Sequence, residues 1–220
     1  MPPRACLSLS PVATSPLRLI CQRLVSDALA TDAVSDARSL RDFQAIVGSL
    51  LYCATHTRPD IAYAVGLLCR AMSRPTPQLH AAALRILYYL HMHRTVGLRY
   101  EPSAACLRGF TDSDWAVKHS TSGFVFEYCS AAISWSSRKQ PTIALSSCEA
   151  EIMAASEGAK EAIYLRNFLS ELGEAVSQPT PMAVDNKGAQ DLSYNPEHHA
   201  RTEHIERRHY FPTALNSAYT

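Results

Sequence analysis

Carboxylates recur at places where short apolar runs end or where a helical pattern begins. Asp112 closes the segment GFTD, Asp185 closes MAVD, and Glu151 lies early in the helical segment SSCEAEIMAA. Glu206 follows in TEHIERRHY. Carboxylates that a fold brings together repel one another unless cations neutralise them, and Mg²⁺ prefers such oxygen ligands. Two such ions about 4 Å apart can hold the attacking and leaving oxygens of a phosphoryl reaction.

Each of these carboxylates also has an ordinary structural explanation. An Asp at a strand end is often a turn residue, and a Glu early in a helix interacts with the helix dipole. Asp114, Glu149 and Asp191 lie nearby along the chain, and spacing alone does not separate them from the first four. Position by itself therefore leaves open which acidic residues form a metal site.

A basic and aromatic patch is the second candidate for chemistry. Arg138, Lys139 and Gln140 follow closely after Trp135. This patch either contacts a nucleic-acid backbone or is an ordinary basic turn after a strand. Both tryptophans, Trp115 and Trp135, are expected in the core rather than on a base-stacking surface.

Histidines form the third candidate group. His198, His199, His204 and His209 lie close together, but their spacing is irregular and no cysteine accompanies them, which argues against zinc. We expect His199 and His204 either to assist product release near the carboxylates or to be solvated surface residues.

The elements that would position these residues lie in the C-terminal half. The segments LRGFTD, GFVFEYC and AAISWSS are rich in aromatic and β-branched residues, and they predict three successive antiparallel strands. A strong helix is predicted from about Ser147 to Leu172, with Ser146 and Glu149 at capping-box spacing and Gly173 as its stop. PMAVD predicts a fourth strand and KGAQDL a short helix. Strands followed by helices indicate an α/β or α+β domain.

The N-terminal half has a different pattern. Residues 1–39 are rich in Ala, Ser and Pro and predict a poorly ordered leader. Residues 40–94 predict three short helices, separated by Arg58-Pro59-Asp60 and by the prolines near position 76. In the third helix, a stripe at helical spacing is expected to face the core. Its members are Ala81, Leu84, Leu87 and Tyr88.

Composition excludes several classes of protein. The 220 residues are 47% hydrophobic and 19% charged with a net charge of +1, so any nucleic-acid contact must come from local patches. Seven scattered cysteines without a CxxC pair argue against a disulfide framework and a thiolate zinc site, and favour reduced thiols in an intracellular protein. The chain has no apolar run near the roughly 18 residues of a membrane span, and its start does not resemble a signal peptide.

Several long motifs, in order, resemble one family. They are IVGSLLYCATHTRPDIAYAVGLLCRAMSRPTPQLHAAALRILYYL, GFTDSDWA, STSGFVF, ISWSSRKQPTIALSSCEAEIMAASEGAKEAIYLRNFL, DNKGAQDL and NPEHHARTEHIERRHYF. This text, over roughly residues 42–211, closely resembles the part of copia-type (Pseudoviridae) retrotransposon Pol polyproteins that follows the polymerase palm.

The resemblance implies an α/β fold and a division of the chain. A ribonuclease H-like domain, with a mixed five-stranded sheet flanked by helices, is expected over 104–211. A small helical remnant of the reverse transcriptase thumb or connection is expected over 40–100, and a divergent tail over 212–220.

The resemblance also implies residue roles. Asp112, Glu151, Asp185 and Glu206 would be the catalytic, metal-binding carboxylates, with Glu151 preferred to Glu149. Glu206 stands where the family often carries Asp. The expected cofactor is a pair of Mg²⁺ ions, with Mn²⁺ possible, and no small-molecule cofactor is expected.

The implied function is endonucleolytic hydrolysis of the RNA strand of RNA–DNA hybrids. The expected partners are the hybrid and the rest of the Pol polyprotein, without a membrane. The expected compartment is the cytoplasm, within a virus-like particle, or the nucleus.

Three departures from the family pattern support an alternative. The stretch 117–121 after DWA is short, Pro212 interrupts the expected final helix, and the chain carries no YxDD polymerase motif. Polymerase activity is therefore not expected. The alternative is a truncated, non-catalytic retrotransposon-derived fragment that at most binds nucleic acid or protein. A host-adopted interaction module built on 40–94 has no positive support in the sequence.

Overall fold

The computed structural model describes residues 37–101, 106–116, 119–174 and 178–186. The chain divides into two compact units, Met1–Arg99 and Tyr100–Thr220. Most of the expected leader, the expected short helix KGAQDL and the tail over 212–220 lie outside the described residues.

The first unit is helical, as predicted from periodicity. Pro59 and Pro77 begin helices rather than interrupt them, because a first-turn proline lacks only an N–H that would have no helical partner. Thr76 caps the last helix by accepting a hydrogen bond from the backbone N–H of Leu79 at 3.3 Å. The elements are α2 (Ala37–His56), a 3-10 turn (Pro59–Ile61), α3 (Ala62–Cys69) and α4 (Pro77–Met92).

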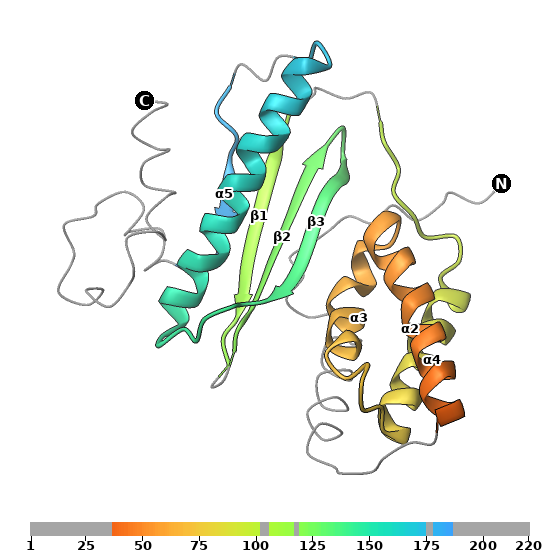
Figure 1. The fold of residues 1–220 in the computed structure, drawn as a ribbon. Helices are drawn as coiled ribbons and strands as arrows, with labels where there is room; N and C mark the ends of the chain where they lie inside the picture. The colour runs from red at the N-terminus through yellow and green to blue at the C-terminus, as the bar shows by residue number, and fades with distance from the viewer. Residues whose placement is uncertain (1–36, 102–105, 117–118, 175–177, 187–220) are drawn as a thin grey trace. The chain divides into compact units, whose positions relative to one another are not determined.

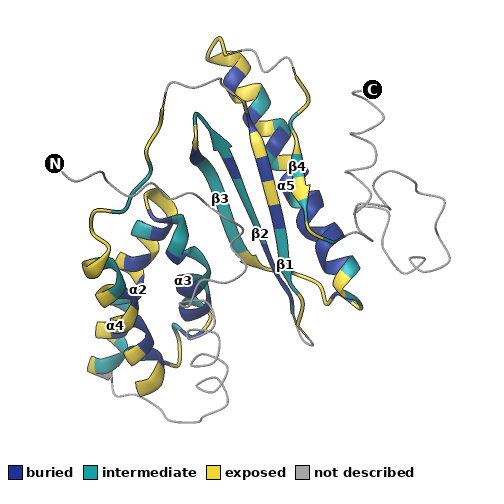
Figure 2. Cartoon of the chain, turned by 180° about the vertical axis from the view of Figure 1, so that it is seen from behind, coloured by how far each residue is buried: buried dark blue, intermediate teal, exposed yellow. Residues whose placement is uncertain are grey.

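The buried face of α4 is not the face that the sequence indicated. The expected core stripe is exposed, with Leu84 at 48% and Tyr88 at 64% exposure. The helix is apolar on two faces, so its periodicity did not determine which face packs inward. Figure 2 shows that α4 has both buried and exposed segments along its length. The helix packs through a second stripe, which consists of Leu79, Ala82, Ala83 and Ile86.

A buried ion pair joins the turn after α2 to α4. Arg58 donates two hydrogen bonds to the carboxylate of Asp60, at 2.9 and 2.7 Å, and a third to the backbone oxygen of His93 at 3.2 Å. The Tyr89 hydroxyl donates to the same carboxylate at 3.0 Å. Both members of the pair are about nine-tenths buried. The RPD motif is therefore a structural clamp in this unit.

The second unit is a mixed sheet covered on one face by a long helix (Figure 1). The strand order is β3-β2-β1-β4, with antiparallel pairing except for the parallel pair β1–β4. The elements are β1 (Arg108–Asp114), β2 (Thr121–Tyr128), β3 (Ala131–Lys139), α5 (Ser147–Glu171) and β4 (Met182–Val184).

This topology confirms the α/β class and the three successive antiparallel strands followed by a helix and a fourth strand. The described residues form a four-stranded sheet rather than the expected five-stranded one. The five-strand expectation came from the resemblance, and the sequence pattern itself marked only the four strands that are present.

The long helix begins and ends where the sequence predicted. The Ser146 hydroxyl accepts from the backbone N–H of Glu149 at 3.1 Å, and Gly173 follows the helix with a φ of +85°. Glu149 reaches back to the N–H of Leu145 at 2.6 Å, one residue before the capping-box position. The helix packs onto the sheet over a core of Leu107, Phe126, Ala162, Leu165 and Leu169.

Two further sequence expectations concern the cysteines and the absence of membrane-spanning segments. Cys53, Cys69, Cys106, Cys129 and Cys148 are free thiols. Within the described part of the chain, none of the helices combines the length and the apolar character needed to cross a membrane.

Candidate metal centre

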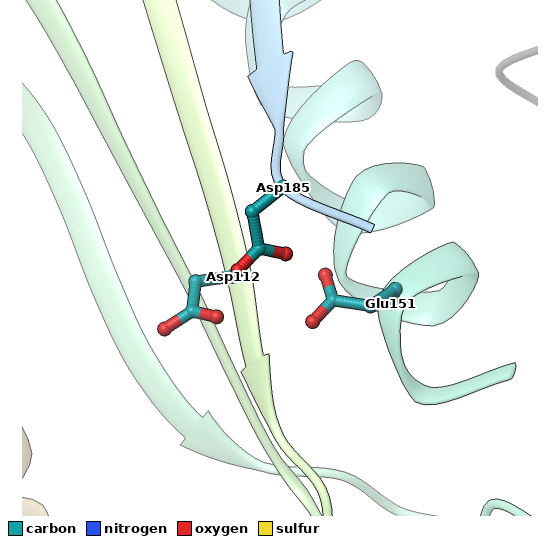
Figure 3. Close-up of side chains that lie close together, drawn as sticks. All are labelled: Asp112, Glu151 and Asp185. Atoms are coloured by element: carbon teal, nitrogen blue, oxygen red, sulfur yellow. The ribbon is translucent and has the colours of Figure 1, made fainter. Parts of the chain in front are cut away.

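Three carboxylates from three separate elements meet at one edge of the sheet. Asp112 lies on β1, Glu151 lies in α5, and Asp185 follows directly after β4. One carboxylate oxygen from each lies within 4.8 Å of the others. Figure 3 shows the three side chains lying close together, with Asp112 and Asp185 beside the strands and Glu151 on the helix.

The parallel pairing of β1 and β4 explains why the two aspartates are neighbours. The last paired residues are Thr111 and Val184. Asp112, still in β1, and Asp185, directly after β4, are the next residues along the chain. Because parallel strands run in the same direction, these two residues emerge side by side at the end of the ladder.

Glu151 reaches this position because β4 is short. Ser113 lies beyond the last β1–β4 pair, and its backbone N–H donates to Oε1 of Glu151 at 3.1 Å. The Ser113 hydroxyl donates to the same oxygen at 2.9 Å. A helix side chain therefore accepts hydrogen bonds at the edge of β1 that β4 leaves open.

The environment of Glu151 disfavours its negative charge. The residue is only 5% exposed, and burial raises the pKa of its carboxyl to about 7. The hydrogen bonds from Ser113 oppose this rise, whereas the negative charges of Asp185 and Asp112 add to it. Near neutral pH this carboxyl is therefore partly protonated unless a cation balances the charges.

The donor set fits a hard divalent cation. All three groups are carboxylates, the ligand type that Mg²⁺ and Mn²⁺ accept. Oε1 of Glu151 is occupied by Ser113, but Oε2 is buried without a hydrogen-bond partner among the described residues. A buried carboxylate oxygen without a donor is costly, and a bound cation would satisfy it.

The competing acidic residues have other positions. Asp114 lies at the end of β1 and Glu149 in the first turn of α5, and neither belongs to the three-carboxylate cluster. Glu149 accepts the backbone N–H of Leu145, as a capping residue does. Asp191, like the predicted Glu206, His199 and His204, lies outside the described residues.

The predicted basic patch divides into two parts. Arg138 and Lys139 are exposed at the end of β3. Gln140 is buried, and its amide Nε2 donates to the hydroxyl of Ser122 at 2.8 Å and to the backbone oxygen of Ala150 at 2.9 Å. Gln140 thus ties β2 to the start of α5 and does not share the exposure of its two neighbours.

Sequence reasoning missed two residues at this edge. Ser113 has no recognisable signal beyond its place between two aspartates. Trp115 was expected in the core, but 49% of its surface is exposed, so the expectation is wrong for this residue. Trp135, which was also expected in the core, is partly buried. The exposure of Trp115 follows from its position just beyond the end of β1, where β2 no longer pairs with the chain.

Comparison with known proteins places the chain in a family. No family model matches it. It is 40% identical over 173 residues to the Retrovirus-related Pol polyprotein from transposon TNT 1-94 of Nicotiana tabacum, covering 77% of this chain and 13% of that polyprotein. The corresponding polyprotein from transposon RE1 of Arabidopsis thaliana is 37% identical over 175 residues, which cover 77% of this chain and 12% of that protein. The chain belongs to the copia-type retrotransposon Pol family.

This Pol segment is short beside those relatives. It spans only 12–13% of the length of the two polyproteins. A shorter relative is the Secreted RxLR effector protein 161 of Plasmopara viticola, which is 44% identical over 124 residues that cover 54% of this chain and 87% of that protein. No solved structure matches the chain.

Proposed function

We propose that this Pol segment is a metal-dependent endonuclease of the ribonuclease H type, which hydrolyses the RNA strand of RNA–DNA hybrids. The observation that carries the proposal is the meeting of Asp112, Glu151 and Asp185 within 4.8 Å at one edge of the sheet. Membership in the Pol family supports it. The motifs of the segment, such as GFTDSDWA, also resemble those of the ribonuclease H region of copia-type elements.

The arrangement of elements gives further support. Three antiparallel strands, a helix and a parallel fourth strand agree with four of the five strands expected of a ribonuclease H-like sheet. We infer that such a domain occupies about 104–211, and that residues 40–100 are the helical remnant of a reverse transcriptase. The division of the chain between Arg99 and Tyr100 is consistent with this assignment.

Asp112, Glu151 and Asp185 would hold a pair of Mg²⁺ or Mn²⁺ ions, with Glu206 as the predicted fourth ligand. Such ions, when bound, lower the pKa of a water nucleophile and balance charge on the departing 3′-oxygen. The carboxylates of the chain fix the ions, and Ser113 fixes Glu151 through two hydrogen bonds. Because Glu151 is buried, it also keeps bulk water from one side of the cluster.

Exposed cations at the same end of the sheet support a nucleic-acid substrate. Lys139 pairs in register with Thr121, and Thr121 pairs with Asp114 at the end of β1. We infer that Arg138 and Lys139 contact the phosphate backbone of the hybrid, and that His199 and His204 are substrate contacts as well. The hybrid itself would be recognised through its A-like minor groove and the RNA 2′-hydroxyl.

The test is cleavage of an RNA–DNA hybrid, labelled on either strand, by the purified chain with Mg²⁺ or Mn²⁺. We expect metal-dependent cutting of the RNA strand alone, with little cutting of duplex DNA. Asp112→Asn should abolish the activity, because it removes a charge from the cluster. Asp114→Asn is the matched control and should retain activity, because Asp114 lies two residues further along the same strand and outside the cluster.

One observation favours a second candidate, a truncated fragment without catalysis. A relative of which the chain matches 87% is a short protein named as a secreted effector, not as a polyprotein. If the folded chain binds neither Mg²⁺ nor Mn²⁺ and cuts no hybrid, the nuclease proposal is wrong and the fragment is the better description. Cleavage of the hybrid that depends on Asp112 would contradict the proposal of a non-catalytic fragment.

A further inference from the structure

An exposed tryptophan lies beside the three-carboxylate cluster. Trp115 follows β1 directly, three residues after Asp112, and is 49% exposed. Its indole N–H donates to the backbone oxygen of Ala144 at 3.3 Å. The single polar atom of the ring is therefore bound to the protein, while about half of the side chain faces solvent.

The loop that holds the indole is anchored and apolar. Ala144 is buried in a small cluster with Ala150 and Met153 of α5, so the hydrogen bond fixes Trp115 to a loop that packs against the helix carrying Glu151. On either side of Ala144, Ile143 is 52% and Leu145 is 70% exposed. Three large apolar side chains thus gather next to a polar site, and such exposed patches mark places of contact with a ligand.

The distance from the cluster suits a nucleic-acid strand. Residues in a strand rise about 3.3 Å each, so Trp115 lies roughly 10 Å beyond Asp112 along the chain direction. Successive bases of a duplex are about 3.4 Å apart, so this separation corresponds to about three base steps. The site of bond cleavage and the indole can therefore contact the same short stretch of one strand.

The charges nearby indicate the kind of ligand. Trp115 is adjacent to Asp114, which pairs with Thr121, and Thr121 pairs with Lys139. The exposed Arg138 precedes Lys139. One end of the sheet therefore combines metal-binding carboxylates, cations suited to phosphate and an open aromatic face, and surfaces that bind single nucleic-acid strands combine cations with aromatic stacking faces.

We propose that Trp115 is a stacking platform for a sugar ring on one strand of the RNA–DNA hybrid, a few nucleotides from the bond that the carboxylate cluster would cleave. The inference rests on the proposed function and adds a substrate-contacting residue to it. Ile143 and Leu145 form the apolar border of the platform, and the hydrogen bond to Ala144 sets the angle of the ring. Trp115 contributes to substrate affinity and not to metal binding.

The experiment uses the full chain and separates binding from cleavage. In a Trp135→Phe background, Trp115 is the sole tryptophan, so its fluorescence reports on the indole directly. A hybrid is titrated with Ca²⁺ in place of Mg²⁺, and cleavage is then measured with Mg²⁺ for Trp115→Ala and Trp115→Phe. Leu172→Ala, which removes a large exposed apolar side chain at the far end of α5, is the matched control.

We expect the hybrid to quench Trp115 fluorescence. Trp115→Ala should raise the KM for the hybrid about fivefold, the low end of the range for one nucleotide stacked on an aromatic side chain. The kcat and the Mg²⁺ concentration for half-maximal activity should stay unchanged, and Trp115→Phe should restore most of the affinity. Leu172→Ala should change none of these values.

The failure of this inference differs from the failure of the proposed function. In one outcome, the chain cuts hybrids, but Trp115→Ala leaves the KM unchanged and the hybrid does not change the Trp115 fluorescence. The proposed role of Trp115 is then wrong, whereas the nuclease proposal remains supported. If the chain cuts nothing, the nuclease is wrong, and the titration alone decides the platform. Quenching by the hybrid then supports it, and an unchanged signal overturns it.

Discussion

Glu151 combines three properties that rarely coincide in a residue without a function. It is buried, it lies beside two other carboxylates, and one of its oxygens has no hydrogen-bond partner among the described residues. Ser113 compensates for part of this arrangement by donating twice to the other oxygen. The two hydrogen bonds from Ser113 therefore hold the Glu151 carboxyl in place beside the two aspartates.

The role of the Ser113 hydroxyl can be measured. Ser113→Ala removes one of the two donors to Glu151 while the backbone N–H remains. We expect Mn²⁺ affinity to fall about tenfold, since a hydrogen bond to a charged group contributes about 1.5 kcal/mol or more. Because that bond lowers the pKa of Glu151, its loss should also move the pH at which Mn²⁺ binds upward.

Calorimetric titration with Mn²⁺ at several pH values tests this prediction. Ser170→Ala, at an exposed position near the end of α5, is the control for loss of a serine hydroxyl. A Ser113→Ala protein with wild-type Mn²⁺ affinity at every pH would show that the hydroxyl does not position Glu151.

The clamp of Arg58 and Asp60 leads to a prediction about stability. Asp60→Asn leaves the buried Arg58 guanidinium without its carboxylate partner. Breaking a buried ion pair from one side costs about 3 kcal/mol or more, so the free energy of unfolding of the helical unit should fall by that order. Tyr89→Phe removes one hydrogen bond to Asp60 and should cost only about 1 kcal/mol.

Urea denaturation followed by circular dichroism, together with hydrogen exchange in α4, measures both losses. Asp42→Asn makes the same chemical change at an exposed position of α2 and should be nearly neutral. Equal effects of Asp60→Asn and Asp42→Asn would mean that the pair does not stabilise the unit.

At the scale of elements, the site depends on how closely α5 approaches the sheet. Gly158 makes this approach possible, because a Cβ at that position would lie 2.5 Å from Cγ2 of Thr111 and 3.0 Å from Cε of Met182. Thr111 precedes Asp112 on β1, and Gly158 lies two turns after Glu151 on α5. The spacing between these two elements therefore sets the distance between two carboxylates of the cluster, Asp112 and Glu151.

Gly158→Ala tests this spacing. Helix propensity alone predicts stabilisation by about 1 kcal/mol. We expect the opposite, because the stiff Thr111 side chain cannot move aside, and overpacking of this kind costs about 1–3 kcal/mol. Metal affinity should fall with stability as α5 shifts away from β1.

The control is Gly48→Ala, in α2, where a Cβ would meet nothing within 4 Å. It should be neutral or stabilising in thermal denaturation. If Gly158→Ala stabilised the chain as much as Gly48→Ala, the absence of a side chain at Gly158 would not be required for the packing of α5 on β1.

Local sequence patterns predicted the strands and the helix that position the site. The pairing of these strands explains why the carboxylates lie together. The strand that ends at Asp112, the strand that ends before Asp185 and the cap at Ser146 all have short-range signals in the sequence. The convergence of the carboxylates depends on a long-range feature, the parallel pairing of β1 with β4. No pattern within either strand encodes that pairing.

Faces and exposure were harder to predict than elements. The outer stripe of α4 and the indole of Trp115 are both apolar, and both were expected inside, yet both are exposed. Gln140 is polar and followed two basic residues, yet it is buried by bonds to Ser122 and Ala150. In each case the neighbouring element decides burial, and residue type alone does not identify that neighbour.

At the scale of the whole molecule, the chain consists of two units, each with its own hydrophobic core and its own sequence motifs. The helical core around Phe43 and Leu68 belongs to one unit, whereas the carboxylate cluster lies wholly within the other. The nuclease proposal therefore needs only the second unit to fold. The three clustered carboxylates all lie within the segment that matches the Pol polyproteins, although this segment covers only 12–13% of their length.

Stability as a function of pH and metal tests this view on the complete chain. With a pKa of about 7 in the folded state against 4.5 ordinarily, Glu151 retains a proton on folding that the unfolded chain releases. The folded state binds more protons between these values, so without metal the free energy of unfolding should fall as pH rises from about 4.5 to 7. The contribution of Glu151 is roughly 3 kcal/mol at most, from 1.36 kcal/mol per pKa unit.

Mg²⁺ should reverse this trend, because it binds the ionised carboxylates and stabilises the folded state by mass action. We expect Mg²⁺ to raise the Tm more at about pH 8 than at about pH 5.5, where Glu151 must first lose its proton. Scanning calorimetry of the full chain measures both Tm shifts. Asp185→Asn should reduce the shift at high pH, whereas Glu171→Gln, at an exposed position of α5, should leave it unchanged. An equal Mg²⁺ effect at both pH values would mean that the ion binds elsewhere, because only a site that includes Glu151 couples metal binding to this proton.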